Sequence, residues 1–417
     1  MSQRMVSVRA LSELITKGTT PTSIGRNFTA NGVRFLKVET FEEDGTYVVG
    51  KEAFIDEETH RQLSRSQLAD GDVLFSIAGA LGRSTVVEPD WLPANTNQAL
   101  AIIRPSRKRG LVRPLYLLWA LRSPTVGKRI NEINVQAAQA NLSLQQVGEF
   151  EIPIPNLAEQ EAIAAALDDV DALVKSLKRI VAKKLDVKQG MMQELLTGRT
   201  RLPGFTGDWR NVTLGDHVAY VRSVALSREQ LDQGSPLRYL HYGDIHTRKS
   251  VRLDATSEFM PRAASHLASG AGRLIPGDLV FADASEDPDG VGKSVEISDV
   301  PPEGVVPGLH TIAARFDKSV LADGFKAYIQ FIPAFRAALL RLAAGTKVLA
   351  TTRSYISSLK LPLPGADEQH AIAQVLEDAD AEIEALERRL ESARAVKVGM
   401  MQELLTGRTR LPTKEEV

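Results

Sequence analysis

Two long stretches of this chain carry apolar residues at alternating spacings of three and four residues. This rhythm is typical of a coiled coil, in which each helix turns one apolar stripe, or seam, toward its partner. The predicted seam positions are Leu167, Val170, Val174, Leu177, Val181, Met191 and Leu195 in the first stretch, and Leu376, Ile383, Leu386, Leu390, Met400 and Leu404 in the second. Because each stripe needs an apolar partner, we expect the two helices to pair with each other in opposite directions.

The two stretches are copies of one another. Residues 187–203 read VKQGMMQELLTGRTRLP and residues 396–412 read VKVGMMQELLTGRTRLP, so 16 of 17 positions are identical at an offset of 209. Asn156 with Glu159 can form a capping box where the first helix begins, and Gly198 and Gly407 lie where C-terminal caps belong. The match continues upstream without a gap, which indicates a segment whose length matters, since loops drift by insertion.

Two lysines interrupt the seam at equivalent positions, Lys188 and Lys397. Two interpretations stay open at this point. In the first, the aliphatic stems snorkel out of the seam and leave the ammonium groups in water. In the second, the charges fix the register of the pair and cost some stability.

Globular regions alternate with the helical ones. We expect globular domains at residues 1–151 and 207–360, and repeated helical segments at 152–206 and 361–417, the last with a short tail. Residues 33–38 resemble 237–242, and the Gly-rich hairpin pattern of 71–87 returns at 277–297. A strand is also predicted at Tyr47–Val49 and a helix at Leu111–Leu121. The whole is predicted to be an α+β fold, with two similar globular domains alternating with two long helices that pair as an antiparallel coiled coil.

Charge is distributed unevenly along the chain. The net charge is −1, but residues 1–150 carry 18 basic and 15 acidic side chains, while residues 361–417 carry 7 and 12. Trp91–Asn131 has eight basic residues and no acidic one, and Gly324–Ala366 has six and none. Basic runs of this kind attract phosphate backbones. The alternative is that part of each run is the solvated face of a helix.

If the basic runs bind a nucleic acid, the candidate contacts are loop residues whose side chains suit base edges or phosphates. Arginine pairs with guanine, and asparagine or glutamine with adenine, in the major groove. The candidates are Arg83, Asn95, Asn97, Gln98, Arg104, Arg107, Lys108 and Arg109 in the first domain, and His241, Lys293, His310, Lys347 and Arg353 in the second. For each of them, phosphate contact or turn formation is the alternative.

A complete catalytic or metal-binding motif is not found in the sequence. Asp289–Ser294 ends like a phosphate-binding loop, but Asp287 stands where the first glycine belongs and a strand pattern follows. The histidines show no metal-ligand spacing, there is no cysteine, and the first residues have no apolar signal core.

One arrangement occurs twice and carries a resemblance to a known family. Pro153, Pro155, Glu159, Gln160 and Ile163 open a helix that ends in ELLTGR, and the pattern returns at the offset of 209. The chain resembles the specificity subunit of a type I restriction–modification system. The resemblance implies two target-recognition domains that each read half of a split, asymmetric site in double-stranded DNA. It also implies that the paired helices set the spacer between the halves.

The same resemblance implies the partners. Two methyltransferase subunits would dock on the paired helices, and endonuclease/translocase subunits would join that core. S-adenosylmethionine, ATP and Mg would bind those partners, so no cofactor is expected in this chain, and it would not be an enzyme. We expect a cytoplasmic location in a bacterium or archaeon, without membrane contact.

Two other classes of function stay open. A coiled-coil adaptor would bind only proteins, and would fail to bind DNA at any salt concentration with methyltransferase subunits present. A self-contained DNA-modifying enzyme would bind a methyl donor as the purified chain.

Overall fold

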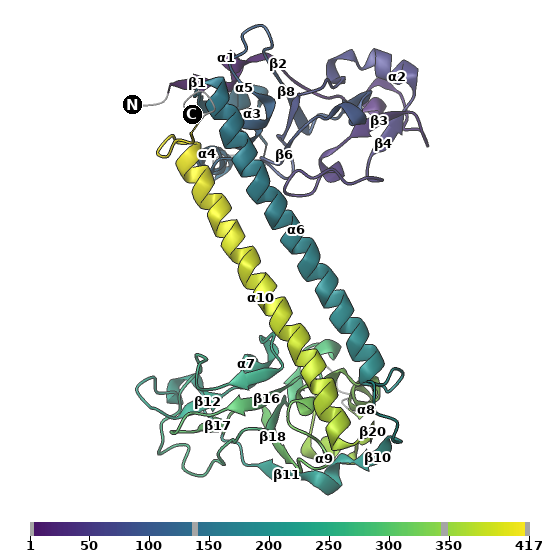
Figure 1. Cartoon of the computed structure of the whole chain (residues 1–417). Helices are drawn as coiled ribbons and strands as arrows, with labels where there is room; N and C mark the ends of the chain where they lie inside the picture. The colour runs from purple at the N-terminus through teal and green to yellow at the C-terminus, as the bar shows by residue number, and fades with distance from the viewer. Residues whose placement is uncertain (1–3, 136–140, 343–348, 413–417) are drawn as a thin grey trace. The chain divides into compact units, whose positions relative to one another are not determined.

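The computed structural model describes residues 4–135, 141–342 and 349–412. The chain divides into two compact units, residues 1–178 with 389–417, and residues 179–388. The long helices α6 (Leu157–Leu195) and α10 (Ala366–Leu404) each contribute their N-terminal part to one unit and their C-terminal part to the other. In Figure 1, α6 is drawn in teal and α10 in yellow. They pack together as an antiparallel pair, which confirms the predicted α+β fold.

The first unit holds two small sheets and a strand pair. The larger sheet has the order β2 (Ser12–Lys17), β8 (Leu100–Pro105), β5 (Val73–Ser76) and β6 (Ser84–Val86). The smaller has the order β4 (Ala53–Ile55), β3 (Val33–Leu36) and β7 (Ala94–Thr96), with β3 and β7 parallel. A separate pair joins β1 (Met5–Ser7) to β9 (Glu151–Pro153), so the two ends of the globular region meet.

The described residues of this unit also form five shorter α-helices: α1 (Val8–Leu11), α2 (Glu57–Gln62), α3 (Pro114–Leu121), α4 (Pro124–Val135) and α5 (Leu144–Gly148). The main core surrounds α3, whose Tyr116 and Trp119 are almost fully buried. Leu167 of α6 and Leu404 of α10 belong to the same core. The long helices are therefore part of the folded domain and not an appendage to it.

The second unit repeats this plan with additions. Its main sheet has the order β11 (Val218–Val221), β18 (Thr311–Phe316), β14 (Leu279–Ala282), β16 (Ser294–Asp299) and β13 (Arg252–Asp254). The pair β12 (Arg238–Leu240) and β17 (Val305–Pro307) is parallel, as β3 and β7 are. The pairs β10 (Arg210–Thr213) with β20 (Lys360–Leu363) and β15 (Ala284–Ser285) with β19 (Leu349–Ala350) complete the strands.

Helices α7 (Tyr242–His246), α8 (Pro333–Leu342) and α9 (Arg353–Ser358) cover this unit. Its largest core includes Leu195 of α6, Leu196 directly after it, and Ile372 and Leu376 of α10. Both units thus bury the N-terminal part of one long helix against the C-terminal part of the other.

Most predicted local elements are found, and one prediction is wrong. The hairpin patterns form β5–β6 and β14–β16, both antiparallel. The predicted capping box is present in part where α6 begins: the Glu159 N–H donates to Asn156 Oδ1 at 2.8 Å, whereas Glu159 Oε1 is buried with no hydrogen-bond partner among the described residues. Tyr47–Val49 is not a strand, because Tyr47 makes only an isolated bridge to Phe41 and its ring stacks on Trp91 instead. Within the described ranges, no helix has an apolar stretch long enough to span a bilayer.

Candidate nucleic-acid interface

Three loops meet at one edge of each globular domain. Parallel neighbours such as β3 and β7, or β12 and β17, send the chain out at the same sheet edge. The loop of the adjoining hairpin reaches that edge in both units. We call this surface the loop edge, and define it as residues 37–41, 77–83 and 97–99 in the first unit and 241–246, 283–293 and 308–310 in the second.

Equivalent hydrogen bonds hold the three loops together. In the first unit the Ile77 N–H donates to the Ala99 carbonyl at 2.9 Å, and in the second the Asp283 N–H donates to the His310 carbonyl at 3.1 Å. A basic side chain then ties the hairpin loop to the first loop. Arg83 donates to the Phe41 carbonyl at 2.6 Å, and Lys293 donates to the His246 carbonyl at 2.5 Å. The two loop edges therefore share one backbone scaffold.

In the first unit, three candidates lie on the loop edge. Gln98 is exposed and accepts a hydrogen bond from the Thr20 hydroxyl at 2.5 Å. Asn97 is half-buried and its Oδ1 accepts from the Ala99 N–H at 3.1 Å. Arg83 is half-buried, and its guanidinium donates to the carbonyls of Val38 and Phe41 in the first loop. DNA contact by Asn97 and Gln98 stays a prediction that this geometry allows.

Two candidates of the first unit are used inside the fold. Asn95 is fully buried on β7, and its amide donates to the Leu63 carbonyl at 3.0 Å and to Ser66 Oγ at 3.1 Å. Arg104 makes a two-pronged ion pair with the fully buried Asp72, with both N···O distances at 2.7 Å. These contacts give Asn95 and Arg104 partners within the fold, and base contact by either residue stays a prediction.

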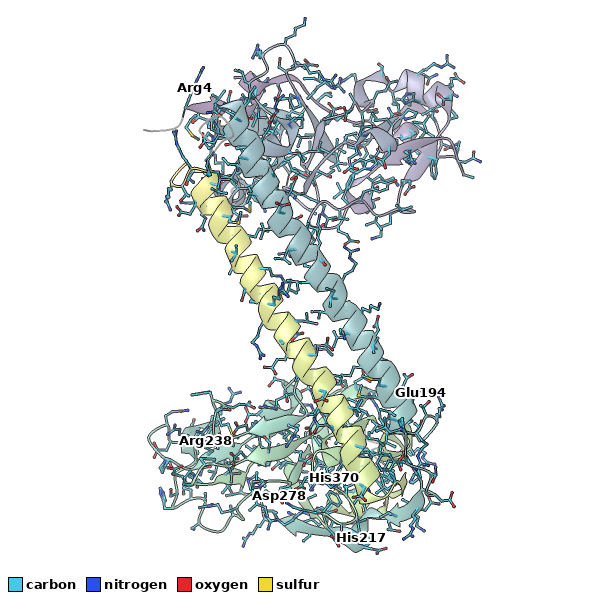
Figure 2. All side chains as sticks on the ribbon, viewed as in Figure 1. Arg4, Glu194, His217, Arg238, Asp278 and His370 are labelled. Carbon is cyan, nitrogen blue, oxygen red and sulfur yellow. The ribbon has the colours of Figure 1, made fainter. Side chains whose placement is uncertain are left out.

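The second unit contains the same ion pair as Arg104 with Asp72. Arg315 donates two hydrogen bonds to the buried Asp278, labelled in Figure 2, with both N···O distances at 2.8 Å. The hydrogen bonds that Arg315 donates to Asp278 raise the pKa of its guanidinium, since with the carboxylate charge they outweigh the opposing effect of burial; Asp72 acts in the same way on Arg104. An ion pair on a buried aspartate is thus repeated in both units and belongs to the domain scaffold.

The basic run Arg107, Lys108 and Arg109 forms an exposed turn after β8, away from the loop edge. Arg107 donates to the Asp70 carbonyl at 3.2 Å and Arg109 to the Ala10 carbonyl at 2.5 Å. These bonds hold the turn but leave most of each charged group exposed, so phosphate contact stays a prediction for this run.

In the second unit, three candidates gather around one tyrosine that was not predicted. Tyr242 has ring-centroid distances of 4.4 Å to His241 and 5.4 Å to His310. Tyr242 and His310 line a hollow of about 660 Å³, and Lys293 lines it as well. His246, which no sequence motif marks, also lines it and lies 6.0 Å from Tyr242. The pairing of β12 with β17 brings Tyr242 beside His310, and the β14–β16 hairpin adds Lys293.

Among the residues around Tyr242, His241 has its ring engaged in a hydrogen bond to the backbone. Burial, the largest cause, lowers the pKa of its imidazole, and the opposing charge of Asp244 does not compensate. The ring is therefore neutral at neutral pH, and its Nδ1 accepts from the Gly243 N–H at 3.1 Å. His241 thus caps α7 as well as lining the aromatic cluster.

The remaining two candidates of the second domain lie elsewhere. Arg353 is exposed at the start of α9, with its guanidinium 5.4 Å from the centre of the Tyr220 ring. Lys347 lies outside the described residues. Among the described residues, no group of three or more acidic, histidine or cysteine side chains has the geometry of a metal site.

Most predicted seam positions of the paired helices are buried, and those near the helix ends join the domain cores. Leu167, Leu177, Val181, Leu376, Ile383, Leu390, Val170, Val174, Leu195 and Leu404 are buried, while Met191, Leu386 and Met400 are half-buried. The next residue after Met400, Met401, is buried instead. Where the helices approach a domain core, the buried face therefore widens beyond a strict seam.

The two seam lysines each complete a three-residue cluster. In the first unit, Lys397 Nζ lies 2.5 Å from Asp171 Oδ1 and 5.0 Å from the centre of the Trp119 ring. In the second, Lys188 pairs with Asp380 and lies 5.9 Å from the centre of the Tyr328 ring. All three members of the two clusters match at the offset of 209. Each lysine therefore joins the opposite helix to a globular domain, which favours the register interpretation over snorkelling.

Divergent loop edges on a repeated scaffold, carried by a repeated helix pair, define a modular binding protein with two similar but unequal binding domains. A family model described as the type I restriction modification DNA specificity domain matches residues 5–183. A putative type I restriction enzyme MjaX specificity subunit from Methanocaldococcus jannaschii is 24% identical over 410 residues, which cover 92% of this chain and 88% of that relative.

Solved structures share the fold over nearly the whole chain. The type I restriction–modification S subunit from M. genitalium aligns with a TM-score of 0.61 at 12% identity, covering 97% of this chain and 96% of the other. A structure from work on complex assembly and conformational transition of the type I system aligns at 0.55 and 17% identity, covering 98% of both chains. The chain is therefore similar, over nearly its whole length, to type I restriction–modification specificity subunits.

Proposed function

We propose that the two globular domains bind double-stranded DNA and that each reads one half of a split, asymmetric site. The supporting observation is that the loop edges share a backbone scaffold but differ in side chains. The first unit has Ile77 and Ala99 where the second has Asp283 and His310, joined by the same backbone hydrogen bond. A common scaffold gives each domain the same approach to a duplex, and different side chains give it a different base preference.

The helix pair would set the distance between the two half-sites and dock two methyltransferase subunits. Both helices have 39 residues, and their C-terminal segments are nearly identical. A repeated surface can bind two copies of one partner in equivalent ways. Endonuclease/translocase subunits would join this core.

Chemistry would belong to the partners. The Asp289–Ser294 segment leads into the strand β16 and not into a helix whose N-terminus could hold a phosphate. S-adenosylmethionine, ATP and Mg would therefore act in the methyltransferase and endonuclease subunits, while this chain supplies the choice of DNA sequence.

Selection from a pool of random duplexes tests this proposal. The full chain, assembled with its methyltransferase partner, should enrich two short constant sequences separated by a gap of fixed length and arbitrary sequence. Binding should weaken steeply as salt rises, because phosphate contacts release counterions. Enrichment of one uninterrupted sequence would contradict the split-site proposal. Failure to bind any DNA at low salt, with the methyltransferase bound, would instead support a protein-only adaptor.

A further inference from the structure

The hollow on the loop edge of the second unit is lined mainly by side chains that can accept hydrogen bonds. His246 and His310 face it with Tyr242, and Glu286 and Asp287 lie on its rim. Lys293 is the one lysine or arginine among the described residues that line it, and its ammonium already donates to the His246 carbonyl at 2.5 Å. A surface of this composition suits a ligand that donates hydrogen bonds.

Acceptor-only partners fix the proton position on both imidazoles. His310 Nδ1 lies 3.0 Å from Asp283 Oδ1, and His246 Nε2 lies 2.8 Å from the Ala284 carbonyl oxygen. A carboxylate and a carbonyl can only accept, so the ring nitrogen facing each of them carries the proton. In the neutral rings, His310 Nε2 and His246 Nδ1 are therefore acceptors.

The wall beside His246 is open because residue 290 is glycine. A Cβ on Gly290 would lie 3.2 Å from His246 Nδ1 and 2.3 Å from Ser285 Oγ. Any larger residue would press on the imidazole and narrow the hollow. The glycine thus keeps the acceptor side of His246 accessible.

The backbone of His310 also marks this position. His310 has a φ of 56° and is the one non-glycine residue with positive φ among the described residues. Such a conformation is costly for a residue with a side chain, and it is found most often at functional sites. Its imidazole is about half exposed, with a side-chain exposure of 51%. The hydrogen bond to Asp283 fixes the orientation of this half-exposed ring. The ring is therefore available for a contact outside the domain.

We propose that this hollow recognises the exocyclic amino group of an adenine or cytosine in the half-site read by the second domain. The inference rests on the proposed function and names the chemistry that this domain reads. Adenine N6 and cytosine N4 are the donors of the major groove, and they match acceptors such as His310 Nε2. A phosphate fits poorly, since Glu286 and Asp287 would repel it. His310 would touch the base, and Asp283 would be a positioning residue.

Base preference measured position by position tests the proposal. The full chain with its methyltransferase partner would be used to select from duplexes randomised within the half-site of the second domain. The wild-type chain should prefer adenine or cytosine at one position. The His310→Gly variant removes the imidazole and relieves the positive φ, so it should fold normally. Loss of one hydrogen bond should reduce the preference at that position roughly 2- to 10-fold.

A donor-only side chain should change the preference and not merely weaken it. In the His310→Arg variant, guanine should replace adenine or cytosine at the same position, since arginine pairs with guanine. The Asp283→Ala variant should broaden the preference there without shifting it to guanine. His266→Ala, which alters an exposed histidine of the same domain outside the hollow, should leave every position unchanged.

The outcomes separate this inference from the proposed function. If wild-type chain selects a split site but both His310 variants keep all base preferences, the hollow does not read bases. If the variants weaken binding to all sequences equally and lower the salt dependence, His310 contacts a phosphate, and the inference is wrong. If the wild-type chain selects no split site, the proposed function fails and this inference fails with it.

Discussion

Lys397 of α10 lies 2.5 Å from Asp171 of α6, and the same lysine stands over the Trp119 ring of α3. This interaction joins two helices and a globular domain through one largely buried charge. The equivalent pair, Lys188 with Asp380, lies 17 residues forward along α6 and 17 residues back along α10. Both pairs therefore belong to one antiparallel register of the helices. A one-turn slip would separate both pairs at once, so the lysines specify the register.

Removing the Lys397 charge should destabilise the fold. In the Lys397→Met variant the stem is kept but Asp171, with a side-chain exposure of 9%, is deprived of its main partner. Because Lys175 still faces Asp171 at 3.0 Å, we expect a decrease of about 1–3 kcal/mol in the free energy of unfolding. Denaturant unfolding measures the change, with Lys183→Met, an exposed lysine of α6, as the control.

A double variant decides whether the decrease comes from this pair. With Asp171→Asn added, no unpaired charge is left buried, so the combined decrease should be smaller than the sum of the two single decreases. Strict additivity would show that Lys397 and Asp171 do not interact in solution.

The same pair should make stability depend on acid. Burial acts to raise the pKa of the Asp171 carboxyl, but hydrogen bonds from Lys397 and Lys175 outweigh it, and the pKa is lowered. The folded carboxyl thus binds its proton less readily than the unfolded one. Its contribution is present above the unfolded pKa of about 4 and is lost as pH falls through the lower folded pKa. The stability difference between wild type and Asp171→Asn should therefore shrink below about pH 4. A difference that stays constant or grows toward acid would contradict this assignment.

The exposed turn after β8 should contribute affinity without sequence preference. Replacing Arg107, Lys108 and Arg109 together by glutamine should weaken binding to all duplexes. The slope of log K against log salt should fall by about 0.9 for each phosphate that the variant no longer neutralises. Titrations at several salt concentrations measure both effects. An altered base preference with an unchanged salt slope would mark this turn as a base reader.

The helix pair should act as a ruler. Inserting seven residues after Leu177 and seven after Leu386 keeps the seam rhythm, so the pair should still form. Each helix would grow by about 10 Å at about 1.5 Å per residue. At about 3.4 Å per base pair, the gap between the half-sites should widen by about 3 base pairs if the helices lie along the DNA. An active variant that kept the original gap would show that helix length does not set it.

Sequence patterns predicted the parts of this fold that depend on local spacing. The seam rhythm, the repeat, the hairpins and the Asn156 cap are all properties of neighbouring residues, and each is found. The seam lysines were visible as exceptions, but their partners were not, because Asp171 and Lys397 are 226 residues apart.

Site residues were harder to predict because residue type does not report burial. Asn95 has the right chemistry for adenine, yet its amide is used by Leu63 and Ser66. Arg104 has the right chemistry for guanine, yet its guanidinium is paired with the carboxylate of Asp72. Tyr242 and His246 were missed, since only the parallel pairing of β12 with β17 brings them beside His310. Long-range strand pairing decides which loop residues share a surface.

Methylation mapping of a chimaera tests the central claim, that each domain reads its own half-site. Residues 207–360 would be replaced by the matching domain of a relative with a different site, leaving residues 1–206 and 361–417 intact. Expressed with its methyltransferase partner, the chimaera should methylate a site in which one half is new and the other half and the gap are unchanged. Changes in both halves, or no change in either, would contradict the account.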